Sequence, residues 1–165
     1  MADPETAPAD PSPPARPSRL TRWRQLPVDE RLIALRLLLL LPVIDVSLRS
    51  VGLQRSWAWL ARFTRRERPT LAPDAAAVAA SLRLAELARA VGARSPWPTS
   101  CLRQALAVWL LLRRRQLPAE IKIGVIPGNL PFQAHAWVEV GGVALDPQAS
   151  AHTAFPPMSP PHERL

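Results

Sequence analysis

Cysteine, lysine and long apolar runs are scarce in this chain, and each shortage narrows the class of protein it can be. One of the 165 residues is cysteine, so no disulfide can form within the chain and a cytoplasmic location is expected. The longest apolar stretch, residues 32–44, is interrupted by Arg36 and Pro42 and is shorter than the roughly 20 residues of a membrane-spanning helix. The N-terminal residues lack the apolar core of a secretory signal. The length suits a single globular domain.

Arginine supplies almost all of the positive charge. The formal net charge is +8, and Lys122 is the only lysine. A basic surface attracts acidic peptides, nucleic acid or anionic lipid. Arginine in place of lysine can also reflect the base composition of a genome. We therefore expect most arginines to form a solvated face, and we expect no nucleic-acid partner.

The apolar pattern is helical over the first two thirds of the chain. Residues 1–19 are rich in proline and are expected to be disordered. A helix is predicted to start near Pro27, and Pro42 is predicted to kink or end it. Asp74 is placed to cap an alanine-rich helix, which Gly92 would close.

The pattern changes from helical to alternating after a third helix, which runs from Cys101 to about Arg115. Strands are predicted at 119–126, 132–140 and 143–146, the last two joined by a Gly141-Gly142 turn. Helices followed by an antiparallel sheet define an α+β fold. The expected organisation is a tail at 1–19, one domain at 20–147 with a helical part (20–94) and a part holding the cysteine helix and the sheet (95–147), and a loose proline-rich tail at 148–165.

The single cysteine stands where the third helix begins, in SPWPTSCLRQALAVWLLLRRR (95–115). A thiol in the first turn of a helix lies near unpaired backbone N–H groups and the positive end of the helix dipole, which both favour the thiolate. Thr99 or Ser100 can cap this helix. A lone cysteine on an apolar helix can equally be a small core residue. The position of Cys101 alone leaves both interpretations open.

A catalytic cysteine needs a base, and His135 stands within a predicted strand. Strand alternation places His135, Trp137 and Glu139 on one face. With Gly141-Gly142 as the turn, Asp146 becomes a diagonal neighbour of His135 on that face, where a carboxylate can orient an imidazole. Glu139 is the second choice for this acid.

The remaining histidines, His152 and His162, fall in the C-terminal tail. One cysteine and three dispersed histidines give no recognisable ligand spacing, so neither a metal nor another cofactor is expected.

Two stretches, SPWPTSCLRQALAVWLLLRRRQLPAEIKIGV and FQAHAWVEVGGVALDP, resemble the peptidase (B) proteins of lasso-peptide biosynthesis, which are transglutaminase-like cysteine peptidases. The stretches lie within residues 95–147. The resemblance implies a papain- or transglutaminase-like fold and removal of a leader peptide from a ribosomally made precursor. It also implies that Cys101 is the nucleophile, His135 the base and Asp146 the orienting acid.

The resemblance further implies three partners. These are the leader of the lasso precursor, a leader-recognition protein and an ATP-dependent cyclase that forms the macrolactam. The recognition protein is expected to be separate, because the residues before the first helix are few and rich in proline.

Several assignments around the cysteine stay open. The oxyanion of an acyl transfer would be held by the Cys101 backbone N–H and a second donor. Candidates for that donor are Thr99, Ser100 and Gln104. Trp97 and Trp137 either line a substrate groove or pack in the core. Two other functions compete with the peptidase: a transglutaminase-like amide transferase, and a non-catalytic basic protein that binds nucleic acid or membrane.

Overall fold

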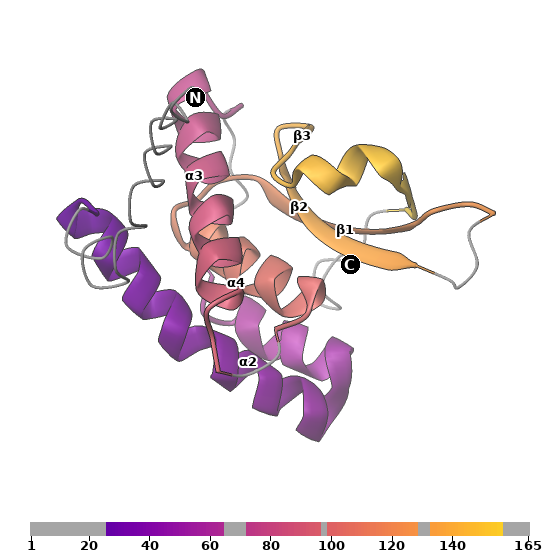
Figure 1. Ribbon diagram of the computed structural model, residues 1–165, viewed down its shortest axis with the longest axis horizontal. Helices are drawn as coiled ribbons and strands as arrows, with labels where there is room; N and C mark the ends of the chain where they lie inside the picture. The colour runs from indigo at the N-terminus through magenta and orange to yellow at the C-terminus, as the bar shows by residue number, and fades with distance from the viewer. Residues whose placement is uncertain (1–25, 65–71, 97–98, 129–132, 157–165) are drawn as a thin grey trace, which may run out of the picture.

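Helices occupy the first part of the chain and an antiparallel sheet the second, which confirms the predicted α+β class. The computed structural model describes residues 26–64, 72–96, 99–128 and 133–156, so the predicted tail at 1–19 lies outside the described residues. The helices are α2 (Val28–Ala61), α3 (Ala75–Gly92) and α4 (Cys101–Arg114). The sheet contains β1 (Ala119–Val125), β2 (Ala134–Val140), β3 (Val143–Ala144) and β4 (Thr153–Ala154), with a 3-10 helix, η1 (Pro147–Ala151), before β4. Figure 1 shows α2 and α3 on one side, the sheet with η1 on the other, and α4 between them.

The first half of α2 buries one face because its core residues recur at intervals of three or four. Ala34, Leu37, Leu41 and Ile44 are each at most 2% exposed. The helix begins directly after Pro27, as predicted. No described helix combines the length and apolar character that a bilayer crossing requires.

The interruption of α2 lies at Gly52, so the helix does not end at Pro42, which was one of the two outcomes predicted there. Pro42 stays inside the helix, whereas Gly52 has φ 77° and ψ 175°. Proline removes one backbone hydrogen bond but keeps a helical φ, while a positive φ interrupts the helix outright. Across the bend, the Ser47 hydroxyl donates to the fully buried hydroxyl of Ser56 at 2.8 Å.

Both ends of α3 are fixed by specific residues. Asp74 caps the helix as predicted, because its Oδ1 accepts a hydrogen bond from the Ala77 N–H at 2.7 Å. Gly92 is the last helical residue, and the C-cap is Ala93 in a right-handed conformation. The glycine serves packing instead: a Cβ there would lie 2.5 Å from Gln104 Nε2 and 2.8 Å from Thr99 Oγ1.

The central element is α4, which contacts α2, α3, β1 and β2. Leu106, Ala107 and Leu112 on this helix are fully buried, as expected of a helix that is covered on several sides. Trp109 meets Trp57 of α2 edge to face, with 5.8 Å between ring centroids. The helix therefore joins the helical layer to the sheet.

The sheet has the strand order β3-β2-β1-β4, with every pair antiparallel. Gly141 and Gly142 have φ of 58° and 81°, which a two-residue turn of this kind requires, and Val140 lies opposite Val143 as predicted. The returning strand ends earlier than predicted, at Ala144, although the Leu145 N–H still donates to the Val138 carbonyl at 2.9 Å.

The segment after Asp146 is folded as far as β4, in contrast to the expected loose tail. In β4, Thr153 lies opposite Val125, and the Phe155 N–H donates to the Ile123 carbonyl at 2.8 Å. Gly124 makes room for this strand, because a Cβ there would lie 2.6 Å from the Thr153 carbonyl oxygen. A strand of two residues has no periodicity that could have predicted it.

The position of the bend in α2 predicts opposite responses to two substitutions. Gly52→Ala is expected to lower the free energy of unfolding by about 1–3 kcal/mol, because alanine tolerates this backbone conformation poorly. Pro42→Ala is expected to leave it unchanged or raise it, since alanine restores a helical N–H. Urea unfolding followed by circular dichroism measures both, and the reverse order of stabilities would contradict the assignment.

Candidate active site

Cys101 is the first residue of α4, and its thiol is free and half-buried. Ser100 occupies the N-cap position with an extended backbone, and its carbonyl accepts a hydrogen bond from the Gln104 N–H at 3.2 Å. The Ser100 side chain makes no capping hydrogen bond. Among the described residues, the N-cap side chain leaves the N–H groups of the first turn uncapped, and these groups make this end of α4 electropositive beside the thiol.

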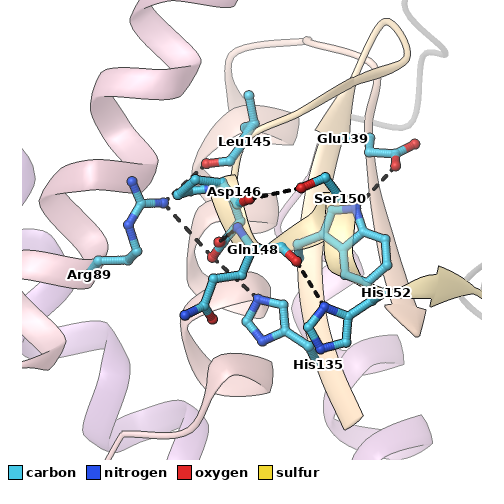
Figure 2. A network of polar contacts seen from close by, with 10 residues as sticks. Arg89, His135, Glu139, Leu145, Asp146, Gln148, Ser150 and His152 are labelled. Carbon is cyan, nitrogen blue, oxygen red and sulfur yellow. Dashed lines mark hydrogen bonds and ion pairs between the residues drawn. The ribbon is translucent and has the colours of Figure 1, made fainter. Parts of the chain in front are cut away.

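His135 and Asp146 face each other across the hairpin, as the predicted register requires. His135 Nε2 lies 3.4 Å from Asp146 Oδ2, and the side chains are 12% and 16% exposed (Figure 2). Among the described residues, His135 Nε2 has no hydrogen-bond partner, so the contact is close but not aligned as a hydrogen bond. Between the two neutral tautomers of the ring, a carboxylate beside Nε2 favours the one with its proton on that nitrogen, so Nδ1 is the nitrogen that can accept a proton.

The carboxylate of Asp146 is held by groups other than His135. Its Oδ1 accepts a hydrogen bond from the Gln148 backbone N–H at 2.9 Å, at the start of η1. Arg89 of α3 places Nη1 at 3.9 Å from Asp146 Oδ2 and donates to the Leu145 carbonyl at 3.1 Å. These contacts, drawn in Figure 2, tie the end of the hairpin to α3.

The second-choice acid, Glu139, is engaged elsewhere. Its Oε1 accepts a hydrogen bond from Trp137 Nε1 at 3.0 Å, and its Oε2 lies 3.8 Å from Lys122 Nζ. Figure 2 shows Glu139 apart from His135 and Asp146. Asp146 is therefore the carboxylate that lies next to the His135 imidazole.

Trp137 is buried at 3% exposure and stacks on His135, with 6.1 Å between ring centroids. It thus packs in the wall of the site, which favours the packing interpretation over an open groove. Trp97, the other tryptophan predicted near the site, lies outside the described residues.

His152 is a neighbour of the site that sequence reasoning assigned to the tail. Its ring centroid lies 5.1 Å from that of His135 and 6.2 Å from that of Trp137. Its Nδ1 is 2.8 Å from the Gln148 carbonyl oxygen, so Nδ1 carries a proton and donates it. The position of His152 depends on the pairing of β4 with β1, for which the sequence carries no periodic signal.

A cavity of about 30 Å³ lies where α3, α4 and the hairpin meet. It has room for about one water molecule. Residues that line it include Ala88, Arg89, Cys101, Gln104, Trp137 and Asp146. Cys101 and Asp146, whose carboxylate faces His135, therefore line the same cavity.

The candidate oxyanion donors differ in their surroundings. Gln104 lines the cavity, and its Nε2 donates to Thr99 Oγ1 at 3.2 Å. This pair packs on Gly92. Ser100 is exposed. Gln104 is thus the candidate side chain that borders the cavity together with Cys101.

Among the described residues, two of the three predicted side chains, those of Cys101 and Asp146, line one cavity, and the third, His135, is linked to them only through its contact with Asp146. In the part of the chain that the structure describes, no hydrogen bond joins the Cys101 thiol to His135. The arrangement can supply a nucleophile, a base and a carboxylate that orients the base, which are the parts of acyl-transfer chemistry.

A sequence profile of the transglutaminase-like superfamily matches residues 38–159, which is more than half of the chain. The chain therefore belongs to the transglutaminase-like superfamily, whose members are generally cysteine-dependent enzymes. The matched region includes Cys101, His135 and Asp146 and extends through β4. No curated protein and no solved structure matched the chain significantly.

The contacts of Arg89 predict that it stabilises the hairpin. Arg89→Met keeps the apolar stem but removes the donor to Leu145 and the charge near Asp146, so we expect a loss of about 1 kcal/mol in the free energy of unfolding. Arg94→Met is the matched control, because Arg94 is exposed just after α3 and, among the described residues, its guanidinium donates to the Ala90 carbonyl of that helix and not to the hairpin. Urea denaturation compares the two variants, and an equal or larger loss for Arg94→Met would contradict this role.

Proposed function

We propose that the chain is a cysteine peptidase that removes the leader peptide from a ribosomally made precursor of the lasso type. One observation carries the proposal: a thiol at the N-terminus of α4 shares a cavity with Asp146, whose carboxylate faces His135. Membership of the superfamily supports cysteine chemistry at this site. The resemblance over residues 95–147 supports the leader peptide as the substrate.

Acylation begins at the bond between leader and core. The Cys101 thiol transfers its proton to His135, and the sulfur attacks the carbonyl carbon at the end of the leader. The oxyanion lies near the Cys101 backbone N–H, with Gln104 as the candidate second donor. When the C–N bond breaks, the imidazolium returns the proton to the leaving amine, and the core peptide departs with a free N-terminus.

Deacylation releases the leader from the thioester. His135 takes a proton from a water molecule, whose oxygen attacks the thioester carbonyl. The C–S bond then breaks, the thiol regains its proton, and the leader departs with a C-terminal carboxylate. Asp146 stabilises the imidazolium in both half-reactions without becoming protonated itself.

The proposed reaction assigns roles to partner proteins. A separate recognition protein delivers the leader, and an ATP-dependent cyclase consumes the freed amine by joining it to an acidic side chain of the core. Both assignments come from the resemblance of the cysteine and histidine segments to lasso-peptide peptidases. No cofactor takes part in the proposed steps.

The proposed roles predict graded losses of activity. Cys101→Ala is expected to abolish cleavage, and His135→Gln is expected to slow it by about 10²–10⁴-fold, because general acid–base catalysis is lost. Asp146→Asn should also slow cleavage, since the amide can still accept from Gln148 but no longer stabilises the imidazolium. The assay incubates the chain with a lasso-type precursor and its recognition protein and measures both fragments by mass spectrometry.

Glu139→Gln is the matched control for Asp146→Asn. It removes the other carboxylate of the same strand face, whose partners are Trp137 and Lys122, and is expected to leave the rate unchanged. Cleavage by the Cys101→Ala variant would refute the peptidase assignment. An intact product that has lost ammonia would assign the same thiol to amide transfer.

A further inference from the structure

The first half of α2 exposes a row of large apolar side chains on the face opposite its buried residues. Five residues at intervals of three or four form this row, the α2 stripe, and are between 47% and 65% exposed: Leu32, Leu35, Leu39, Val43 and Val46. This spacing places them along one side of the helix. In Figure 1, the indigo half of α2 lies at the edge of the molecule away from the sheet.

A groove of about 540 Å³ borders the α2 stripe, between α2 and the C-terminal end of α4. Its apolar walls are Ile33, Leu39, Leu40, Val43 and Leu111. Its charged residues are Arg36, Arg114 and Arg115, which are exposed, and no acidic residue lines it. The groove is therefore apolar at its walls and positive at its rim.

Among the described residues, none of these three arginines forms an ion pair. The carboxylates of α2 that do form ion pairs are engaged with other arginines: Glu30 with Arg83, and Asp45 with Arg49 and Arg103. The charges around the groove are thus left for a ligand to neutralise. The complementary ligand is apolar along its centre and acidic along its sides.

We propose that this groove docks an acidic amphipathic helix of a partner protein. A groove between two helices accepts a third helix whose apolar residues recur at intervals of three and four. Carboxylates on the flanks of that helix would pair with Arg36, Arg114 and Arg115. A second copy of this chain fits less well, because it would bring two sets of these arginines together on a chain of net charge +8.

The location of the groove leaves the candidate active site open. Cys101 begins α4, whereas Arg114 ends this helix of 14 residues. At 1.5 Å per residue the two ends are about 20 Å apart. A docked helix would therefore not cover the thiol, and the docking proposal stands whether or not the chain is a peptidase.

The test uses the full chain and a fluorescent synthetic helix as the probe. One version carries leucines at every third or fourth position with glutamates beside them, and a second carries lysines in place of the glutamates. Fluorescence anisotropy is expected to show about tenfold tighter binding of the acidic probe, with an affinity that falls as salt is added. The combined variant Arg36→Gln, Arg114→Gln, Arg115→Gln is expected to lose about tenfold in affinity.

A matched triple variant outside the groove controls for net charge: Arg55→Gln, Arg62→Gln, Arg94→Gln. It should bind the acidic probe as the unmodified chain does. Equal loss in both triple variants, or equal affinity for both probes, would overturn the proposal. If sedimentation shows a concentration-dependent dimer, and Leu39→Asp abolishes that dimer, the groove would be assigned to a second copy of the chain. If the unmodified chain binds phosphatidylglycerol vesicles and only the groove variant loses this binding, the groove would be assigned to a membrane surface.

Discussion

The burial of α4 between the other helices and the sheet is the constraint on which the rest of the structure depends. Leu106 and Leu112 are fully buried, so this helix cannot shift without opening the core. Its N-terminus is thereby fixed beside the hairpin that carries His135 and Asp146. Its C-terminus is fixed beside α2. One helix therefore presents a thiol at one end and a group of arginines at the other.

The candidate site is preorganised by contacts from several elements. Asp146 is held by a backbone N–H of η1 and by the guanidinium of Arg89 from α3, so its carboxylate stays beside His135 without help from substrate. Gly92 allows α3 to approach the beginning of α4 closely. The positive end of the α4 dipole lies beside the thiol of Cys101, the first residue of that helix. The superfamily match agrees with cysteine chemistry at this point of the fold.

Much of this arrangement could be predicted from local sequence signals, whereas the pairing of segments that lie far apart in the sequence could not. A few consecutive residues were enough to predict three features: the Asp74 cap, the start of α4 at Cys101 and the Gly141-Gly142 turn. The turn determines the register that puts Asp146 beside His135. The bend at Gly52 was missed because proline is the stronger sequence signal for a kink, although a positive φ interrupts a helix more completely. The ring of His152 was missed because its place depends on a two-residue strand that pairs with β1.

The most direct test of the central claim, that the Cys101 thiol and the His135 ring converge, uses the scarcity of cysteine in this chain. His135→Cys adds a second thiol, and dibromobimane bridges two thiols within one chain only when they lie close together. The account predicts an intramolecular bridge in this variant, detected by mass spectrometry of the digested protein. It predicts none in Glu139→Cys, which places the thiol about 13 Å further along β2. Absence of the bridge in His135→Cys, or an equal yield in both variants, would contradict the account.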